Sequence, residues 1–291
     1  MPLVKDEAII LSTRLFGESD KIVRFFTLSS GKLSGIAKGA KKSQKRFMNT
    51  LEPFNQVLIE YFEKPTNSLV RIENADLKES NSGLELSLKR VCVASFFTEF
   101  VDKLTKEKQR NGHLFQTLKK VLDGLKLVEF SVTDILYYEL QMLRHLGYML
   151  NLAACVHCGK ALADVEKLYF SKERGGTLCI GCARSVPHRQ YPQGFIPRML
   201  ALNGTRTIDS RGQVRGNLSS EHGEPGTHSR EEAEGWREAP TGFPVEGATR
   251  APMAASSAGF ERMGREVLED FVKFHLAVEF KSYRLLKSIT G

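Results

Sequence analysis

Ala8-Ile9-Ile10-Leu11 and Ile22-Val23-Arg24-Phe25-Phe26 are two short β-prone runs, and Phe16-Gly17-Glu18-Ser19-Asp20 between them has the composition of a turn. Three more candidate strands follow in the first 80 residues: Leu33-Ser34-Gly35-Ile36-Ala37, the partly alternating run 54–62, and Leu69-Val70-Arg71-Ile72. Five strands joined by turns this short predict a small barrel or sandwich. An OB-type barrel over residues 1–80 is the leading candidate.

The hydrophobic period becomes helical after this β-rich part. Apolar residues recur at steps of three and four, first at Leu84, Leu88, Val91, Ala94, Phe97, Val101 and Leu104. Three further helices are predicted. The first covers 114–125, the second runs from a cap at Thr133-Asp134 to Gly147, and the last covers 267–289. The predicted fold class is therefore α+β, with a five-stranded OB-type barrel followed by a helical domain over 81–291.

One segment of the predicted helical domain has a different composition. Residues 203–258 are rich in Gly, Ser, Thr, Glu, Arg and Pro and have almost no periodic apolar positions. Such a segment buries too little surface to offset the entropy lost on ordering. We expect a disordered insertion over this range.

The charge of the chain favours a polyanionic partner. The formal net charge is +8, and eight basic residues with no acidic one lie between Lys21 and Leu51. Such an excess suits nucleic acid or an anionic membrane surface. No apolar run approaches the roughly 20 residues that span a bilayer, and the N-terminus becomes acidic too early for a secretory signal. We therefore expect a cytoplasmic protein.

The basic run indicates a candidate nucleic-acid site on a loop between two predicted strands. Its candidate residues are Lys32, Lys38, Lys41, Lys42, Lys45 and Arg46. Phe47 and Phe54 are near enough in sequence to stack on bases, and cationic loops with aromatic rings are typical of single-strand binding. The alternatives are a solvated loop that only aids solubility and two phenylalanines that belong to the core.

Four of the five cysteines form two Cys-x-x-Cys pairs, Cys155/Cys158 and Cys179/Cys182. This spacing is typical of a tetrahedral zinc site, and a glycine beside each pair, Gly159 or Gly181, would ease the bend. Four thiolates would leave no open position, so the zinc would be structural. A redox pair and four free cysteines are the alternatives. We expect a zinc finger over 151–184, in which His157 faces solvent or lies beside the ligands and is not itself a ligand.

Sequence motifs of catalysis are missing. The chain has no nucleophile elbow, Walker loop, dinucleotide fingerprint or HExxH motif. We therefore predict a binding protein and not an enzyme. A hydrolase with an unrecognised site stays as an alternative.

Several segments, in order, resemble the bacterial recombination mediator and DNA-repair family RecO. The segments are Glu7-Ala8-Ile9-Ile10-Leu11 with Gly17-Glu18-Ser19-Asp20-Lys21-Ile22; Ala37-Lys38-Gly39-Ala40-Lys41-Lys42 with Leu51-Glu52-Pro53-Phe54; Leu146-Gly147-Tyr148 with Asn151-Leu152-Ala153-Ala154-Cys155; and Lys281-Ser282-Tyr283-Arg284-Leu285-Leu286. Together they cover roughly 1–200 and 261–291. Residues 203–258 depart from the family, which has helical structure there.

The resemblance implies a function in the RecF pathway of DNA repair. It implies binding of single- and double-stranded DNA, annealing of complementary strands, and help in loading RecA onto DNA coated by single-strand-binding protein. RecR and single-strand-binding protein would be partners, and the chain would be associated with the nucleoid. A zinc-containing RNA-binding or ribosome-associated module is the alternative, because barrels and zinc knuckles also serve RNA.

Overall fold

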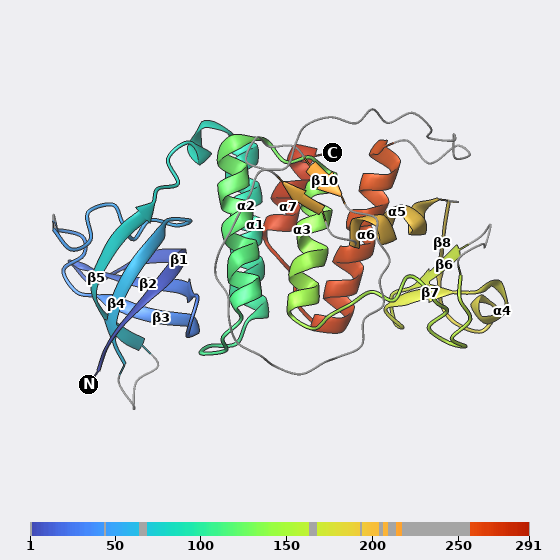
Figure 1. Cartoon of the computed structure of the whole chain (residues 1–291), viewed down its shortest axis with the longest axis horizontal. Coiled ribbons are helices and arrows are strands. Elements are labelled where there is room, and N and C mark those ends of the chain that lie inside the picture. Colours follow the sequence, from blue (N-terminus) through green and yellow to red (C-terminus); the bar gives the residue numbers. More distant parts are fainter. Residues whose placement is uncertain are drawn as a thin grey trace, which may run out of the picture.

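The computed structural model describes residues 2–43, 45–63, 69–162, 168–192, 194–203, 206–208, 214–216 and 257–290. A β-barrel lies at one end of the molecule, a bundle of helices lies in the middle, and a small module with three strands lies at the other end (Figure 1). Within the described residues, no helix has the length and apolar character that crossing a membrane requires. This architecture confirms the predicted α+β class.

The barrel is built from five strands in the order β1-β2-β3-β5-β4, which close on each other. Their bounds are β1 Leu3–Phe16, β2 Asp20–Thr27, β3 Gly31–Ala37, β4 Gln56–Phe62 and β5 Leu69–Glu79. Only the β3–β5 pairing is parallel among these neighbours; the others are antiparallel. The closed five-stranded sheet confirms the OB-type barrel.

The two faces of the barrel strands enter two different cores. Val23 and Phe25 alternate into the barrel interior, as the period of two in a strand requires. Ile9 and Phe26 belong instead to the core that the helices share, and the rings of Phe26 and Phe115 lie 6.1 Å apart. Part of the outer face of the barrel is therefore buried against the helical bundle.

Helices α1 (Leu88–Leu104), α2 (Gly112–Leu127) and α3 (Val132–His145) follow a short 3-10 turn at Leu84–Leu86. The third helix begins earlier than the sequence predicted. Ser131 is its cap, and the Ser131 hydroxyl accepts from the Asp134 N–H while the Asp134 carboxylate accepts from the Ser131 N–H. This reciprocal pair satisfies two of the free N–H groups at the helix start.

The single C-terminal helix predicted over 267–289 is wrong, because the structure has two helices. These are α6 (Ser257–Leu276) and α7 (Ser282–Thr290), and Ala277 between them has a left-handed backbone with φ 53°. The Glu99 carboxylate on α1 accepts from the backbone N–H groups of Lys281 and Ser282. A carboxylate at the start of a helix stabilises that helix. The contact with Glu99, which is distant in sequence, therefore marks the start of α7, although the apolar pattern in the sequence continues without a break there.

A buried carboxyl group joins α3 to α7. Glu139 is 1% exposed and accepts a hydrogen bond from the Tyr283 hydroxyl. Burial raises the pKa of Glu139 to about 7, against the opposing effects of Tyr283 and the charge of Arg265. The helical core therefore contains an acid that titrates near neutral pH.

Most of the predicted insertion, 203–258, lies outside the described residues. The parts that are described include β9 (Arg206–Ile208) and β10 (Val214–Gly216), which pair as an antiparallel two-stranded sheet. Helix α5 (Phe195–Asn203) ends at the start of this range, and α6 begins within its last residues. The predicted disordered insertion otherwise falls on residues outside the described ranges.

Candidate functional site

The four paired cysteines lie in the module at the far end of the molecule from the barrel (Figure 1). Its sheet has the order β7-β6-β8, with β6 Leu168–Ser171, β7 Gly176–Leu178 and β8 Arg189–Tyr191. The turn between β6 and β7 contacts α6, where the His275 Nε2 atom lies 2.7 Å from the Lys172 carbonyl oxygen. The module is thus held to the helical bundle by its hairpin.

Local backbone geometry turns each cysteine pair toward the same point. Gly159 has φ 75°, and its N–H donates to the Cys155 carbonyl at 2.8 Å, which closes the first loop. The second pair spans the start of the helical turn α4 (Ile180–Ala183), for which Cys179 is the cap residue. Gly181 was expected to ease a bend here, but it lies inside α4 and is not among the glycines with positive φ.

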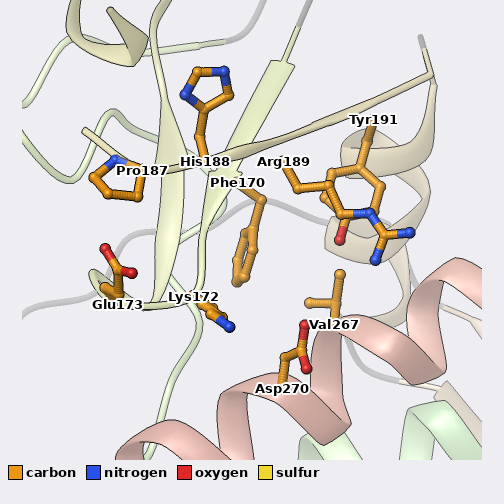
Figure 2. Close-up of a pocket in the computed structure, with 9 residues that line it drawn as sticks. All are labelled: Phe170, Lys172, Glu173, Pro187, His188, Arg189, Tyr191, Val267 and Asp270. Atoms are coloured by element: carbon orange, nitrogen blue, oxygen red, sulfur yellow. The ribbon is translucent and has the colours of Figure 1, made fainter. Parts of the chain in front are cut away.

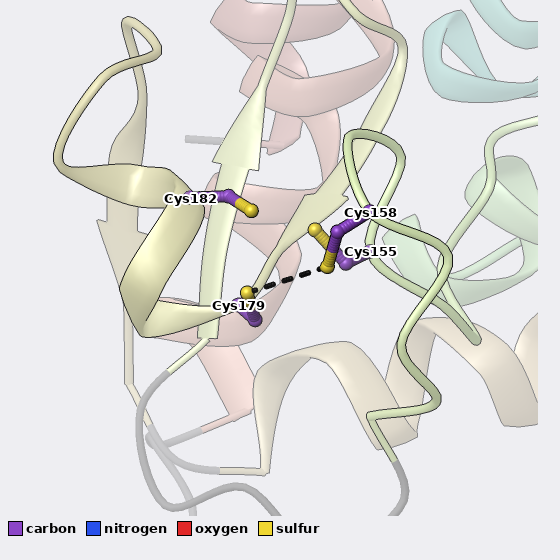
Figure 3. A group of neighbouring side chains, drawn as sticks. All are labelled: Cys155, Cys158, Cys179 and Cys182. Carbon is purple, nitrogen blue, oxygen red and sulfur yellow. Dashed lines mark hydrogen bonds between the residues drawn. The ribbon is translucent and has the colours of Figure 1, made fainter.

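Tertiary folding brings the four sulfurs into one cluster. The Sγ atoms of Cys155, Cys158, Cys179 and Cys182 all lie within 4.8 Å of one another, close enough to hold one metal ion (Figure 3). The Sγ atoms of Cys158 and Cys179 are 3.8 Å apart. Cys92 is buried in α1, away from this group, and His157 is exposed.

The electrostatics of the cluster suit a bound cation. Burial raises the pKa of Cys155, but backbone N–H groups of Cys179, Cys158 and His157 outweigh it and lower the pKa to about 6. The side chain of Cys179 raises the pKa of Cys182 to about 12. The sulfurs therefore interact directly with one another, and a divalent cation can replace their protons because thiolates are the form that binds metal.

A cavity of about 350 Å³ lies between the sheet of this module and α6 (Figure 2). Lys172 and Arg189 from the module and Asp270 from α6 contribute charged groups to its wall. An ion pair of 2.9 Å between Arg189 and Glu266 crosses the same seam. The lining residues include no Ser, Thr or Cys, so the wall carries no hydroxyl or thiol nucleophile of these types.

The structure places five of the six basic candidates on one loop of the barrel, between β3 and β4. Lys38, Lys41, Lys42 and Lys45 are exposed, and so is Arg46. Among the described residues, none of the four lysines makes an ion pair within 4 Å. Arg46 donates to the Lys38 carbonyl at 3.1 Å, which ties the two ends of this cationic loop together.

Lys32 differs from these five residues. Its side chain is only 12% exposed and lies between the barrel and α1. Its ammonium group donates to the Asp102 carbonyl and lies 3.5 Å from the Asp102 carboxylate. These contacts place Lys32 in the interface between barrel and helices, away from the surface that the cationic loop presents.

The two phenylalanines considered for base stacking are not on the surface of the loop. Phe47 is 2% exposed in the barrel core, and Phe54 packs against the helical core. Met48 is an exposed apolar side chain of the loop itself, and Leu15 and Phe16 are exposed at the end of β1. The sequence signal for them was the turn after Phe16, which places that residue at the tip of a hairpin.

The structure is that of a candidate nucleic-acid-binding protein. It has a closed barrel with a cationic loop, and the barrel packs on a helical bundle that carries a four-cysteine module. Two family models match the chain, "Recombination protein O N terminal" over residues 1–81 and "Recombination protein O C terminal" over residues 85–202. The chain therefore belongs to the RecO family.

Individual relatives support the same assignment. A DNA repair protein RecO from Thermoanaerobacter sp. (strain X514) is 38% identical over 186 residues, which are 62% of this chain and 72% of that protein. A DNA repair protein RecO from Myxococcus xanthus (strain DK1622) is 32% identical over 219 residues, 74% of this chain and 88% of that protein. The function of the chain thus lies in DNA repair and recombination.

Proposed function

We propose that the chain is a recombination mediator that binds single- and double-stranded DNA, anneals complementary strands and assists RecA loading onto DNA coated by single-strand-binding protein. RecR and single-strand-binding protein are the proposed partners in this RecF-pathway role. The observation that carries the proposal is the exposed cationic loop on an OB-type barrel in a member of the RecO family. Such a protein acts by binding, without turnover chemistry, in the cytoplasm at the nucleoid.

The cationic loop supplies the means of binding DNA. Its lysines lie within eight residues of one another, from Lys38 to Lys45, and they face solvent. Exposed ammonium groups that neutralise phosphates release counterions, and this release favours binding to either single strands or duplex. A surface that binds phosphates on both forms is what strand annealing requires.

We propose that the cysteine cluster holds one structural zinc ion on Cys155, Cys158, Cys179 and Cys182. Zinc–thiolate bonds of about 2.3 Å in a tetrahedron separate the sulfurs by about 3.8 Å. The Cys158–Cys179 separation of 3.8 Å agrees with this geometry. Four thiolates fill the coordination sphere, so the ion stabilises the module and leaves the DNA-binding chemistry to other residues.

We also propose a domain boundary near residue 80, between the barrel and the helical domain 81–291. The first family model ends at residue 81 and the second begins at 85, which supports a junction after β5. The zinc finger, 151–184, would then be an insertion between α3 and α5 of the helical domain.

Annealing of complementary strands tests the proposed function. Complementary oligonucleotides, naked or coated with single-strand-binding protein, are mixed with stoichiometric protein and no nucleotide, and duplex formation is followed by fluorescence transfer. We expect faster annealing on both substrates, and loss of this acceleration in a variant with Lys38, Lys41, Lys42 and Lys45 replaced by Gln. Wild-type protein without any effect on either substrate would contradict the proposal.

Competition with RNA distinguishes the proposed DNA-repair function from the alternative, a zinc-containing RNA-binding or ribosome-associated module. Matched DNA and RNA oligonucleotides of one sequence compete for the same amount of protein. Preference for RNA by tenfold or more would favour a role in RNA binding. Equal or stronger binding of DNA supports the repair function.

A further inference from the structure

Stacking of an unpaired base on the barrel requires an exposed ring, and the cationic loop itself does not present one. Phe47 in the loop is buried under the Arg46 guanidinium, whose carbon lies 4.9 Å from the ring centre, and Phe54 near the end of the loop packs against the helical core. Phe16 is 52% exposed at the end of β1, and its neighbour Leu15 is 62% exposed. An exposed phenylalanine at a strand end loses the usual benefit of burying its ring.

Pairing between β1 and β2 places Phe16 beside the cationic loop. Phe16 lies directly opposite Asp20 in the antiparallel ladder, so the two side chains are on one face of the sheet. The Asp20 carboxylate accepts from the Gly39 N–H at 2.8 Å, and the Ser19 carbonyl accepts from the Lys41 N–H at 2.9 Å. The hairpin tip and the start of the loop are therefore one connected surface.

The same contacts hold the start of the cationic loop at the hairpin tip that carries the ring. The N–H of Gly39, the Ser19 hydroxyl and the charge of Lys38 lower the pKa of Asp20, which keeps the carboxylate ionised as an acceptor for the loop. Lys38 directly precedes Gly39, whose N–H is bound by Asp20, and Lys41 is bound to Ser19 through its own N–H. An exposed ring on a hairpin tip that is joined to a loop with exposed lysines suits a base and the phosphates near it.

We propose that Phe16 is a stacking platform for an unpaired base, in a single-strand subsite formed by the β1–β2 hairpin tip and the cationic loop. This inference rests on the proposed function and adds selectivity to it. The lysines attract phosphates of single strands and duplex alike, whereas the ring can stack only on a base that is free of its partner. Phe16 therefore shifts the preference of the barrel toward single strands.

The Phe16→Ala variant of the full chain tests this role. We expect its affinity for a labelled oligo(dT) to fall about 5- to 100-fold, as loss of one base–ring stack predicts. Its affinity for duplex DNA should stay within about twofold of wild type. Leu15→Ala is the matched control, since it removes an exposed apolar side chain next along β1 and should leave both affinities unchanged.

A tryptophan probe adds a direct readout of stacking. Trp236 is the single tryptophan of the chain, so Trp236→Phe gives a background without indole fluorescence. Phe16→Trp in this background should keep single-strand affinity, and oligo(dT) should quench its emission strongly at saturation. Duplex DNA should quench it far less.

The outcomes distinguish this inference from the proposed function. Wild-type single-strand affinity in Phe16→Ala, with affinity lost in the four-lysine variant, would overturn the stacking role and leave the proposed function standing. Equal losses on single strands and duplex in Phe16→Ala would also overturn it. If the four-lysine variant binds both substrates as wild type does, the assignment of the cationic loop fails.

Discussion

Replacing Lys38, Lys41, Lys42 and Lys45 together by Gln should flatten the salt dependence of single-strand binding. These four side chains are exposed and, among the described residues, free of ion pairs within 4 Å. Each therefore reaches a phosphate without first breaking an internal contact. The variant keeps the backbone of the loop, because Gln retains most of the length of the side chain.

The size of the effect follows from the number of free cations. Each neutralised phosphate of a single strand contributes about −0.7 to the slope of log affinity against log salt. Four lysines therefore contribute about −3, which is roughly 50-fold in affinity between 50 and 200 mM salt. Lys32 is left out of this number because its ammonium group is bound to Asp102 at the barrel–helix interface.

Fluorescence anisotropy of a labelled oligo(dT), titrated at several salt concentrations, measures the slope. The matched control is a variant with four other exposed lysines replaced by Gln, which also make no ion pair among the described residues: Lys106, Lys120, Lys172 and Lys281. Both variants lower the formal net charge of +8 by the same amount. Only the loop variant should lose the contribution of about −3 that the four lysines make to the slope.

Two results would refute this reasoning. An unchanged slope in the loop variant would mean that its lysines do not contact phosphates. Equal flattening in both variants would mean that net charge, and not the position of the loop, determines the salt dependence.

Three further predictions concern stability. Cys155→Ser with Cys158→Ser should release zinc, measured by metal analysis, and lower the melting temperature, because such a site contributes on the order of 10 kcal/mol to its module; a metal-free variant of full stability would count against a structural role. Glu139 binds a proton in the folded state between its ordinary pKa of 4.5 and about 7, so its contribution to stability falls as pH rises through this window. Glu139→Gln should remove that slope in denaturant unfolding measured from pH 4.5 to pH 8, whereas an unchanged slope would contradict the raised pKa. Lys32→Ala should cost about 2 kcal/mol of folding stability through loss of its Asp102 contacts and leave the salt slope of DNA binding unchanged; a flattened slope would return Lys32 to the binding surface.

Local patterns in the sequence were enough for the main architecture. Alternating apolar residues and short turns predicted the barrel, and the helical period predicted α1 to α3, because each of these signals depends on neighbours within a few positions. The division of the C-terminal region into α6 and α7 could not be read in this way. Glu99, more than 180 residues earlier, caps α7, and no periodic pattern records such a contact.

For each candidate site, too, the sequence predicted one part and only the folded structure showed the rest. The spacing of two Cys-x-x-Cys pairs predicted a metal site, but only folding brought Cys155 and Cys179 to one cluster with all sulfurs within 4.8 Å. The basic run predicted a cationic surface, but position in the sequence could not tell that Lys32 is held at an interface and that Phe47 is in the core.

The sequence by itself determined the kinds of element, the four possible metal ligands and the sign of the charge on the barrel. Tertiary structure decided which charges are free and which ring is exposed. Phe16 illustrates the reason: its exposure depends on the pairing of β1 with β2 and on the loop that Asp20 holds through Gly39. Burial and ion pairing are properties of groups distant in the chain, so they exist only once those groups have been brought together.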